Sequence, residues 1–543
     1  MTNLDTPKEA LSERQLNTNL ISRVNVGDML TRSASRAPRA LAIVDGQRRL
    51  TYEEFNTCVN RVAHGLLRSG YRRGDRLALV SANRAEFLVT YYACAKTGVV
   101  AVPVNLGWTA RETAYVLDHA QVRGVVVESD RVPTLRETLS GLERVDDVWV
   151  LPPTGNGTVD LPPQWAEYAD LAADETSEPR CYVDDRDPLQ YLYTSGTTSA
   201  PKGVVTSHLA VYIESLGGAF DKQLRRGEKM ACVMPLFHCA QLNTWCTGLV
   251  AIGAAMVLMR GFDADQWLHA VETERITVAF LLPMMIRTLL AREDIRRRDL
   301  SSLRLLVYAM APMPQHELEH AMGAFGCEFA LSFGQTEMSP ESTFHLPEHQ
   351  LSHIGAVGTA GVSVEVGIMA EDGRLLPPGE TGEIVYRSPQ VLTGYLENEQ
   401  ATDEAFRHGW FHSGDLGRLD DDRVLYFVDR VKDVIKSGGE NIASIDVEKA
   451  CFAADPNIAD VAVVGLPHEH WTEAITAVVL PRPGTKVDLD ALREKLHESL
   501  SGFKIPKSFI TVEEMPRTST GKIQKVALRQ TFADHYTRNT RDQ

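Results

Sequence analysis

The sequence predicts an α/β protein with a large N-terminal domain and a smaller C-terminal domain. Three observations predict it. Strand-like apolar runs alternate with helical segments over the first part of the chain, the pattern of a parallel sheet covered by helices. Short strands with tight turns replace this alternation over 382–430. A compact run of helices and strands follows, so we expect domains at 26–430 and 431–543 after a polar segment at 1–25.

A helix is expected from residue 51, where Thr51 and Glu54 form a capping box and Gly70 ends the pattern. One apolar face follows the cap, made by Phe55, Val59, Val62, Leu66 and Leu67. Strand-like runs come next at 76–82, 99–105 and 124–129, with helical segments between them. A proline- and glycine-rich loop is expected at 151–164, after which strands and helices resume to about residue 380.

The C-terminal run predicts a helix at 444–454, strands at 458–465 and 473–480, and a helix at 488–500. The last helix carries one apolar face, made by Leu489, Leu492, Leu496 and Leu500. This regular α/β pattern is what a small independent domain requires.

Composition sets the class of protein. The chain has 543 residues, 44% hydrophobic and 24% charged, with a formal net charge of −16, which argues against nucleic acid or an anionic membrane as main partner. Eight cysteines without a CxxC pair are typical of a reducing cytosol. The first 25 residues lack an apolar signal core, and the longest apolar stretch, 248–259, is too short to span a bilayer. We therefore expect a cytoplasmic protein, with 248–259 as a buried strand or helix.

The stretch YTSGTTSAPKG at 193–203 packs hydroxyls, glycines and a lysine directly after a strand-like run. Backbone N–H groups of such a loop can converge on phosphate oxygens, and Lys202 adds a positive charge. The spacing of a Walker A loop is absent, so a polar surface loop is the alternative for this stretch taken alone.

Four further stretches carry groups suited to a nucleotide. FGQTE (333–337) places an aromatic ring, a glycine and a carboxylate together, and WFHSGDLG (410–417) offers Asp415, expected in a tight turn. VDRVKDVIKSGGENIAS (428–444) carries Arg430 and Lys432 at the domain boundary, and PRTSTGKIQK (516–525) presents Lys522 on a glycine-flanked turn. Taken singly, Asp415 is a turn residue, Lys522 a solvated charge and Arg430 part of an ion pair.

In these five motifs, their order and their spacing, the chain resembles the adenylate-forming enzymes, which include acyl-CoA synthetases, amino-acid adenylation domains and firefly luciferase. The resemblance covers about residues 25–530. It implies a large N-terminal domain of helix-covered mixed sheets plus a β-rich subdomain, with a small hinged C-terminal α/β domain. It also implies ATP, Mg²⁺ and coenzyme A as ligands, and an enzyme that forms an acyl-AMP and then a thioester.

The resemblance assigns roles on the ATP side. Phe333 would stack on adenine beside Gly334, Thr336 would bind the α-phosphate and Glu337 would hold Mg²⁺. Asp415 and Arg430 would contact the ribose. The loop over the β- and γ-phosphates would consist of Thr194, Ser195, Gly196, Thr197, Thr198 and Lys202.

The resemblance also assigns the acid and thiol sides. Lys522 would bridge the substrate carboxylate and the α-phosphate. In the family the small domain swings about a hinge residue, here Lys432, between the two half-reactions. After that swing Lys436, Gly438 and Asn441 would help to shape the thiol tunnel.

The resemblance also implies an acyl pocket lined by His238, Gln241, Ala309 and Met310. Taken alone, a histidine in an apolar run such as His238 is more often a buried core residue. Met310 stands where the family often has glycine, so its side chain should shorten or narrow the pocket. We therefore expect a short, medium or flat acid, and acceptance of longer acids by the Met310→Gly variant. Ser199 replaces another family glycine and carries strain if that position needs a positive φ.

Three other histidines, His345, His349 and His353, are spaced by four residues, as metal ligands on a helix would be. Pro347 interrupts such a helix, so a solvated loop is the favoured interpretation.

Alternative functions remain open. An acyl-AMP ligase that loads a carrier protein uses the same thiol chemistry, and only the absence of an obvious long insertion before the hinge favours coenzyme A. Luciferase-like oxidation of the adenylate depends on the substrate rather than on the motifs. A non-catalytic nucleotide-binding module and an ADP-forming kinase are disfavoured because neither needs Lys522. No acidic residue is placed to bind an α-amino group, which disfavours amino-acid activation.

Overall fold

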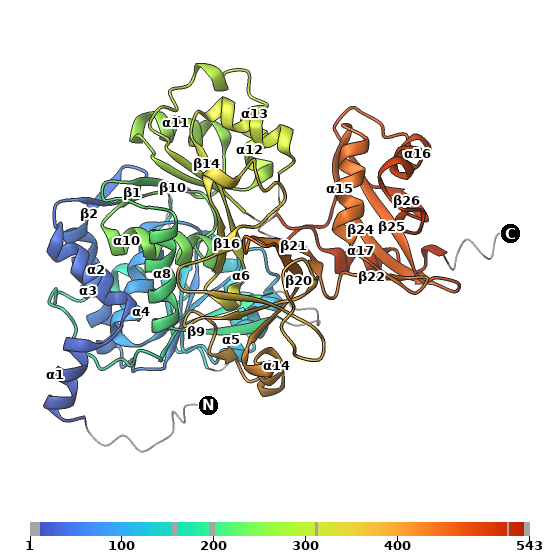
Figure 1. Cartoon of the computed structure of the whole chain (residues 1–543). Helices are drawn as coiled ribbons and strands as arrows, with labels where there is room; N and C mark the ends of the chain where they lie inside the picture. Colours follow the sequence, from blue (N-terminus) through green and yellow to red (C-terminus); the bar gives the residue numbers. More distant parts are fainter. Residues whose placement is uncertain are drawn as a thin grey trace. The chain divides into compact units, whose positions relative to one another are not determined.

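The computed structural model describes residues 11–142, 144–154, 161–194, 201–309, 313–518 and 521–536. These residues form two compact units, and Figure 1 shows their helices and strands. Unit 1 consists of the chain up to Glu365 together with 387–406. Unit 2 consists of 366–386 and the chain from Arg407 onward.

The first sheet of unit 1 begins as the parallel sheet that the sequence predicts. Strands β3, β4, β5, β6 and β7 and the start of β8 pair in parallel, and β9 and β19 add an antiparallel edge. Within the described residues the order is β19-β9-β8-β4-β3-β5-β6-β7. The bounds are β3 Arg76–Val80, β4 Val100–Pro103, β5 Gly124–Glu128, β6 Asp147–Leu151, β7 Ala166–Glu167, β8 Pro188–Thr194, β9 Lys202–Ser207 and β19 Gly394–Tyr395.

The second sheet of unit 1 is mixed, since its central strands are parallel and both ends are antiparallel. In the described part of the chain its order is β16-β15-β14-β13-β12-β10-β11-β1-β2. The bounds are β1 Leu41–Asp45, β2 Arg48–Thr51, β10 Lys229–Cys232, β11 Ala255–Leu258, β12 Val278–Leu281, β13 Leu305–Tyr308, β14 Glu328–Gly334, β15 Glu341–His345 and β16 Thr359–Ala360.

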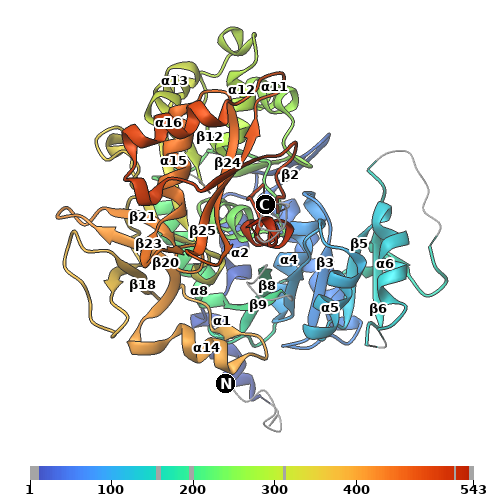
Figure 2. The same ribbon diagram turned by 90° about the vertical axis from the view of Figure 1, so that its right-hand side faces the viewer.

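Helices cover both sheets of unit 1. Helices α2, α3, α4, α8 and α10 pack on one another (Figure 1). Helices α5 and α6 lie along β3, β5 and β6 (Figure 2), where Val116 and Leu135 join a core with Val125. The bounds are α1 Glu13–Ser22, α2 Val26–Arg36, α3 Tyr52–Arg68, α4 Ala85–Thr97, α5 Ala110–His119, α6 Val132–Leu139, α7 Tyr168–Leu171, α8 His208–Asp221, α9 Cys239–Gln241, α10 Gly248–Ile252, α11 Ala264–Glu274, α12 Pro283–Leu290, α13 Gln315–Phe325 and α14 Glu399–Ala405.

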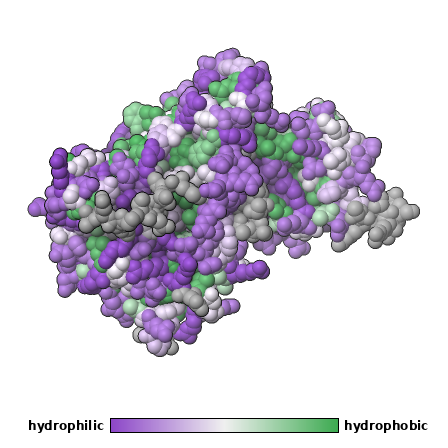
Figure 3. Space-filling model, turned by 90° about the horizontal axis from the view of Figure 1, so that it is seen from below, coloured by the Kyte–Doolittle hydropathy of each residue, from purple (hydrophilic) through white to green (hydrophobic). Residues whose placement is uncertain are grey.

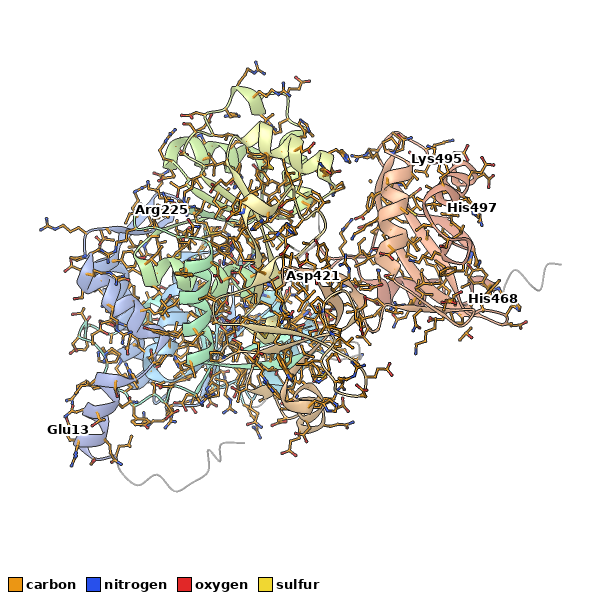
Figure 4. All side chains as sticks on the ribbon, viewed as in Figure 1. Glu13, Arg225, Asp421, His468, Lys495 and His497 are labelled. Atoms are coloured by element: carbon orange, nitrogen blue, oxygen red, sulfur yellow. The ribbon has the colours of Figure 1, made fainter. Side chains whose placement is uncertain are left out.

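Unit 2 begins with the β-rich segment. Strands β17 (Glu365–Met369), β18 (Gly382–Arg387), β20 (Phe411–Leu419) and β21 (Leu425–Arg430) form a sheet in that order. Asp421, labelled in Figure 4, lies in the turn from β20 to β21. The predicted short strands and tight turns are therefore confirmed here, although the sequence interpretation overlooked helix α14 within the same interval.

The rest of unit 2 is the predicted α/β run. Strand β24 (Ile458–His468) pairs with β25 (Thr472–Pro481), and α15 (Ser444–Ala454) and α16 (Leu489–Ser499) share one core. Leu492 and Leu496 are buried in that core, which confirms the predicted apolar face of the last helix. The remaining elements are β22 Ile435–Ser437, β23 Glu440–Ile442, β26 Ser508–Thr511 and α17 Lys525–Thr531.

Several predicted details are confirmed. The capping box at Thr51 is formed and α3 ends just before Gly70, whose φ is +83°. The stretch 248–259 contains both a buried helix, α10, and a buried strand, β11. Among the described residues, no helix combines the length and the apolar character that crossing a membrane requires. The face drawn in Figure 3 is mostly hydrophilic. The boundary near Arg430 stays a prediction, because unit 2 also contains 366–386 and 407–430.

Candidate active site

A hairpin in unit 1 positions Thr194 and Lys202, two residues predicted to bind phosphate. Thr194 ends β8 and Lys202 begins β9, and the two are register partners across the antiparallel pair. This pairing closes the base of the predicted phosphate loop. The loop residues themselves, Ser195, Gly196, Thr197 and Thr198, lie outside the described residues, as does Ser199.

The turn after β14 carries the next predicted residues. Phe333 and Gly334 end β14, and Thr336 and Glu337 begin a single 3₁₀ turn. A β-carbon at Gly334 would lie 1.9 Å from the carbonyl oxygen of Pro340, so only glycine fits there. The close approach lets the chain fold back and present Thr336 and Glu337 beside the strand end.

Tyr395 connects these two parts of the site, and the sequence interpretation missed it. Its hydroxyl donates to Glu337 Oε1 at 3.1 Å, and Lys202 Nζ lies 5.2 Å from the centre of its ring. A cavity of about 270 Å³ borders Lys202 and Tyr395, with His119 and Asn398 also in its wall. The structure thereby brings Lys202 and Glu337 into contact with the same side chain.

A buried charged network lies behind the same turn. The Lys222 ammonium pairs with Glu341 at 2.6 Å, and their side chains are 0% and 3% exposed. Burial, and then the charge of Glu341, raise the pKa of Glu214 well above its usual range. Gln390 Nε2 donates to Glu214 Oε2 at 3.1 Å and to the carbonyl of Met338 at 2.9 Å. The network therefore anchors the turn that carries Thr336 and Glu337.

His238 lies at the start of a short helical segment. Its Nδ1 accepts a hydrogen bond from the Ala240 N–H at 3.3 Å, which caps α9. Burial lowers the pKa of His238 to about 4, so the ring is neutral at pH 7. The neighbouring Cys239 Sγ lies 3.4 Å from Thr336 Oγ1. The structure thus brings this segment to the turn that carries Thr336 and Glu337.

The other pocket residues are described only in part. Gln241 is fully buried and its Oε1 accepts from the Met234 N–H at 3.3 Å. A π-helix (Leu242–Thr247) follows it, an irregularity found frequently at functional sites. Ala309 follows β13 and is half-buried, whereas Met310 lies outside the described residues.

Asp415 and Arg430 face each other within unit 2. They are register partners on β20 and β21, and Arg430 Nε lies 3.4 Å from Asp415 Oδ1. Asp415 is 6% exposed. The expected tight turn at Asp415 is wrong: the positive φ of +73° falls on Gly414, and Asp415 is already part of the strand. Strand pairing, rather than a turn, fixes the carboxylate.

Lys522 lies in a turn near the end of unit 2. Gly521 has φ +83°, and the Lys522 N–H donates to Thr518 Oγ1 at 3.1 Å, which confirms the predicted glycine-flanked turn. Loss of hydration, and then the positive charge of Arg430, lower the pKa of Lys522 to about 8, while Asp415 partly offsets this. Asp415, Arg430 and Lys522 are therefore close enough to act on one another electrostatically.

The predicted hinge residue, Lys432, lies between β21 and β22. Burial, followed by the charge of Arg430, lowers its pKa. The next residue, Asp433, pairs with Arg529 of α17 at 2.8 Å, and its N–H donates to the Arg430 carbonyl. The hinge role itself stays a prediction.

Lys436, Gly438 and Asn441 come together on a β-hairpin. Lys436 and Asn441 are register partners on β22 and β23. Gly438 and Gly439, with φ of +60° and +88°, make the two-residue turn between the strands, which requires positive φ at both positions. A β-carbon at Gly438 would also lie 3.0 Å from the Trp471 ring.

Mg²⁺ binds through one or two carboxylates together with substrate phosphates and water. Glu337 is a single carboxylate that contacts the same tyrosine as Lys202, and it fits that donor set. Across the described ranges no group of three or more His, Cys, Asp or Glu side chains is arranged to hold a metal ion. His345 corrects the expectation of a solvated loop: it is buried at the end of β15, and burial lowers its pKa to about 4.

Comparisons with known proteins show which family the chain resembles. A model of the AMP-binding enzyme family matches residues 30–396, and a model of the AMP-binding enzyme C-terminal domain matches 446–522. Feruloyl-CoA synthase from Amycolatopsis sp is 35% identical, over 93% of this chain and 99% of the relative. Long-chain-fatty-acid–CoA ligase FadD13 from Mycobacterium tuberculosis is 32% identical, over 94% and 99%.

Two further proteins are similar over nearly the whole chain. The fatty acid–[acyl-carrier-protein] ligase ScoC from Streptomyces coeruleorubidus is 31% identical, over 92% of this chain and 95% of the relative. The crystal structure of ATP-bound MatB from Rhodopseudomonas palustris has a TM-score of 0.86 at 28% identity, covering 95% of this chain and 100% of MatB.

Proposed function

This chain belongs to the AMP-binding, adenylate-forming family of enzymes and is most like an acyl-CoA ligase; from that premise we propose that it joins a carboxylic acid to coenzyme A in two steps. The observation that supports the chemistry best is the grouping of Asp415, Arg430 and Lys522, distant in sequence, within electrostatic range of one another.

In the first step a carboxylate oxygen attacks the α-phosphorus of ATP. A new P–O bond forms, the bond to the bridging oxygen of pyrophosphate breaks, and pyrophosphate leaves. Two anions must approach each other, so Lys202 on the phosphate side and Lys522 on the carboxylate side offset their repulsion. Mg²⁺ held by Glu337 would neutralise further phosphate charge.

Other side chains bind and orient the nucleotide. The Asp415 carboxylate, held by strand pairing and by Arg430, accepts two hydrogen bonds from the ribose hydroxyls. Thr336 donates to the α-phosphate, and Phe333 stacks on the adenine. His238 is neutral at pH 7, so it orients the acid by packing and hydrogen bonding and not by charge.

In the second step the thiol sulfur attacks the acyl carbon of the mixed anhydride. A C–S bond forms, AMP leaves and the thiol proton passes to solvent. This step needs a different lining, which a rotation at Lys432 and the hairpin with Lys436, Gly438 and Asn441 would supply.

The proposed acid is short, medium or flat. The similarity to a feruloyl-CoA synthase supports a flat aromatic acid, whereas the similarity to FadD13 supports a long chain. The Met310 side chain decides between them in this proposal, so a Met310→Gly variant should accept longer acids. An unchanged chain-length profile would contradict that part.

The function is tested by pyrophosphate release over a panel of aromatic and aliphatic acids with ATP and Mg²⁺. We expect acid-dependent release that turns over only with coenzyme A, and its loss in Lys522→Ala. Lys504→Ala is the matched control, because Lys504 pairs with the exposed Asp446 in the same unit. No release with any acid would contradict the proposal.

Transfer to a carrier protein is the second candidate, supported by the similarity to ScoC. In that case a single turnover would release the same amount of pyrophosphate with and without coenzyme A. Repeated turnover would then require a carrier protein bearing phosphopantetheine.

A further inference from the structure

Tyr395 touches both of the charged residues that the proposed function places on the phosphate side of ATP. Its hydroxyl donates to Glu337 Oε1 at 3.1 Å, and the ring lies under the Lys202 ammonium, 5.2 Å from the ring centre. Lys202 and Glu337 carry opposite charges, yet no ion pair joins them in the part of the chain that the structure describes. Instead, each of the two charges contacts the same phenol, the carboxylate at the hydroxyl and the ammonium at the ring.

Strand pairing and a hydrogen bond to α14 hold Tyr395 in this position. Tyr395 pairs with Val204 across β19 and β9, and Val204 lies two residues after Lys202 on the same strand. Its N–H donates to Thr402 Oγ1 at 2.9 Å, which ties it to α14. The Leu392 N–H donates to the Glu337 carbonyl at 2.7 Å, so the same segment also holds the backbone of the turn.

The chemistry of the phenol suits this position. A phenol is neutral at pH 7, so the Tyr395 hydroxyl is a donor to the Glu337 carboxylate. A carboxylate that accepts a neutral O–H keeps its negative charge for a cation. An ammonium over a ring keeps its N–H groups for phosphate oxygens, which a lysine paired with a carboxylate would not.

We propose that Tyr395 is a positioning residue that keeps Lys202 and Glu337 apart and presents them to a nucleoside triphosphate and its divalent cation. The inference rests on the proposed function, because that function gives both charges their ligands. In this role Tyr395 acts through Lys202 and Glu337 and not on the acid or the reacting phosphorus.

Two substitutions separate the two contacts. Tyr395→Phe removes the hydroxyl and keeps the ring, and Tyr395→Leu removes both. Because hydrogen bonds to charged groups are among the stronger ones, we expect Tyr395→Phe to raise the Mg²⁺ concentration for half-maximal pyrophosphate release by about tenfold. The KM for the acid should stay unchanged. Tyr395→Leu should in addition weaken binding of ATP without Mg²⁺.

A binding measurement supplies the readout that is independent of turnover. Calorimetric titration with α,β-methylene-ATP over a series of Mg²⁺ concentrations should give the same shift for Tyr395→Phe. Tyr193→Phe is the matched control, because its hydroxyl bonds His119 Nδ1 at 2.8 Å and contacts neither charge. It should behave as the parent chain.

A double-mutant cycle with Glu337→Gln decides the case even if Tyr395→Phe is less stable. The effects of the two changes on Mg²⁺-dependent binding should be strongly non-additive. Additive effects, or an unchanged or lowered Mg²⁺ requirement in Tyr395→Phe, would overturn the inference and leave the proposed function intact. Absence of Mg²⁺-dependent release in the parent chain would instead refute the proposed function.

Discussion

Replacing Lys222 by methionine should destabilise unit 1 strongly at pH 7 and only weakly at pH 5. The substitution leaves Glu341 buried at 3% exposure without its partner, next to the equally buried Glu214. Glu214 is itself a carboxyl group, with a raised pKa, and so cannot replace the lost ammonium as a partner for Glu341. The lone carboxylate of Glu341 must then take up a proton for the chain to stay folded.

The cost follows from the pH. Protonating a glutamate of ordinary pKa, about 4.3, costs about 1.4 kcal/mol for each pH unit above that value. At pH 7 the cost is about 3.7 kcal/mol, within the range of about 3–5 kcal/mol for breaking a buried ion pair from one side. At pH 5 it falls to about 1 kcal/mol, because the unfolded chain is then already partly protonated.

Urea unfolding followed by circular dichroism at the two pH values measures this. Lys222→Met/Glu341→Gln removes both charges and should recover most of the loss at pH 7. Arg275→Met is the control, since Arg275 and Asp299 form an ion pair whose side chains are 50% and 58% exposed. Its loss should stay below about 1 kcal/mol. A loss below that value for Lys222→Met, or an equal loss at both pH values, would refute the reasoning.

Three further predictions concern the site. The rate of adenylation, measured by ATP–pyrophosphate exchange, should fall as the pH rises through about 8, because Lys522 loses its positive charge there. The Lys522→Arg variant should not show this fall. A rate that does not change with pH in the parent chain would contradict the prediction. Asp415→Asn should raise the KM for ATP about tenfold with little change for the acid, since one ribose hydrogen bond to a charge is weakened; equal changes in both constants would speak against a ribose contact. His238 has a pKa of about 4, so the parent profile should show no step near pH 6.5, and His238→Phe should change the KM for the acid without altering the shape of that profile.

Local pattern predicted the elements whose signals lie within a few residues. Thr51 and Glu54 form their capping box, and the leucine face of α16 is buried as expected. Asp415 was misplaced because a glycine before an aspartate is typical of a turn, whereas pairing with Arg430 makes it part of a strand. Helix α14 was overlooked because seven residues carry too little periodicity to stand out among short strands.

Contacts between distant positions could not be predicted from local pattern. Lys222 and Glu341 look like surface charges in their own segments and become a buried pair only when α8 lies against β15. Tyr395 shows no signal of its own, since its two partners come from other strands and turns. The motif residues could be assigned only because the resemblance supplied their roles.

The path of the chain through the two units constrains how genes of this family can recombine. The strands of the sheet β17-β18-β20-β21 span Glu365 to Arg430, with a segment of unit 1 inserted between β18 and β20. A single crossover inside that interval would build one sheet from strands of two parental sequences, so that side chains from different parents would pack against one another. A crossover just after Arg430 would pass on the α/β part of unit 2 whole. Viable natural hybrids should therefore have their junctions concentrated in the short segment around Lys432.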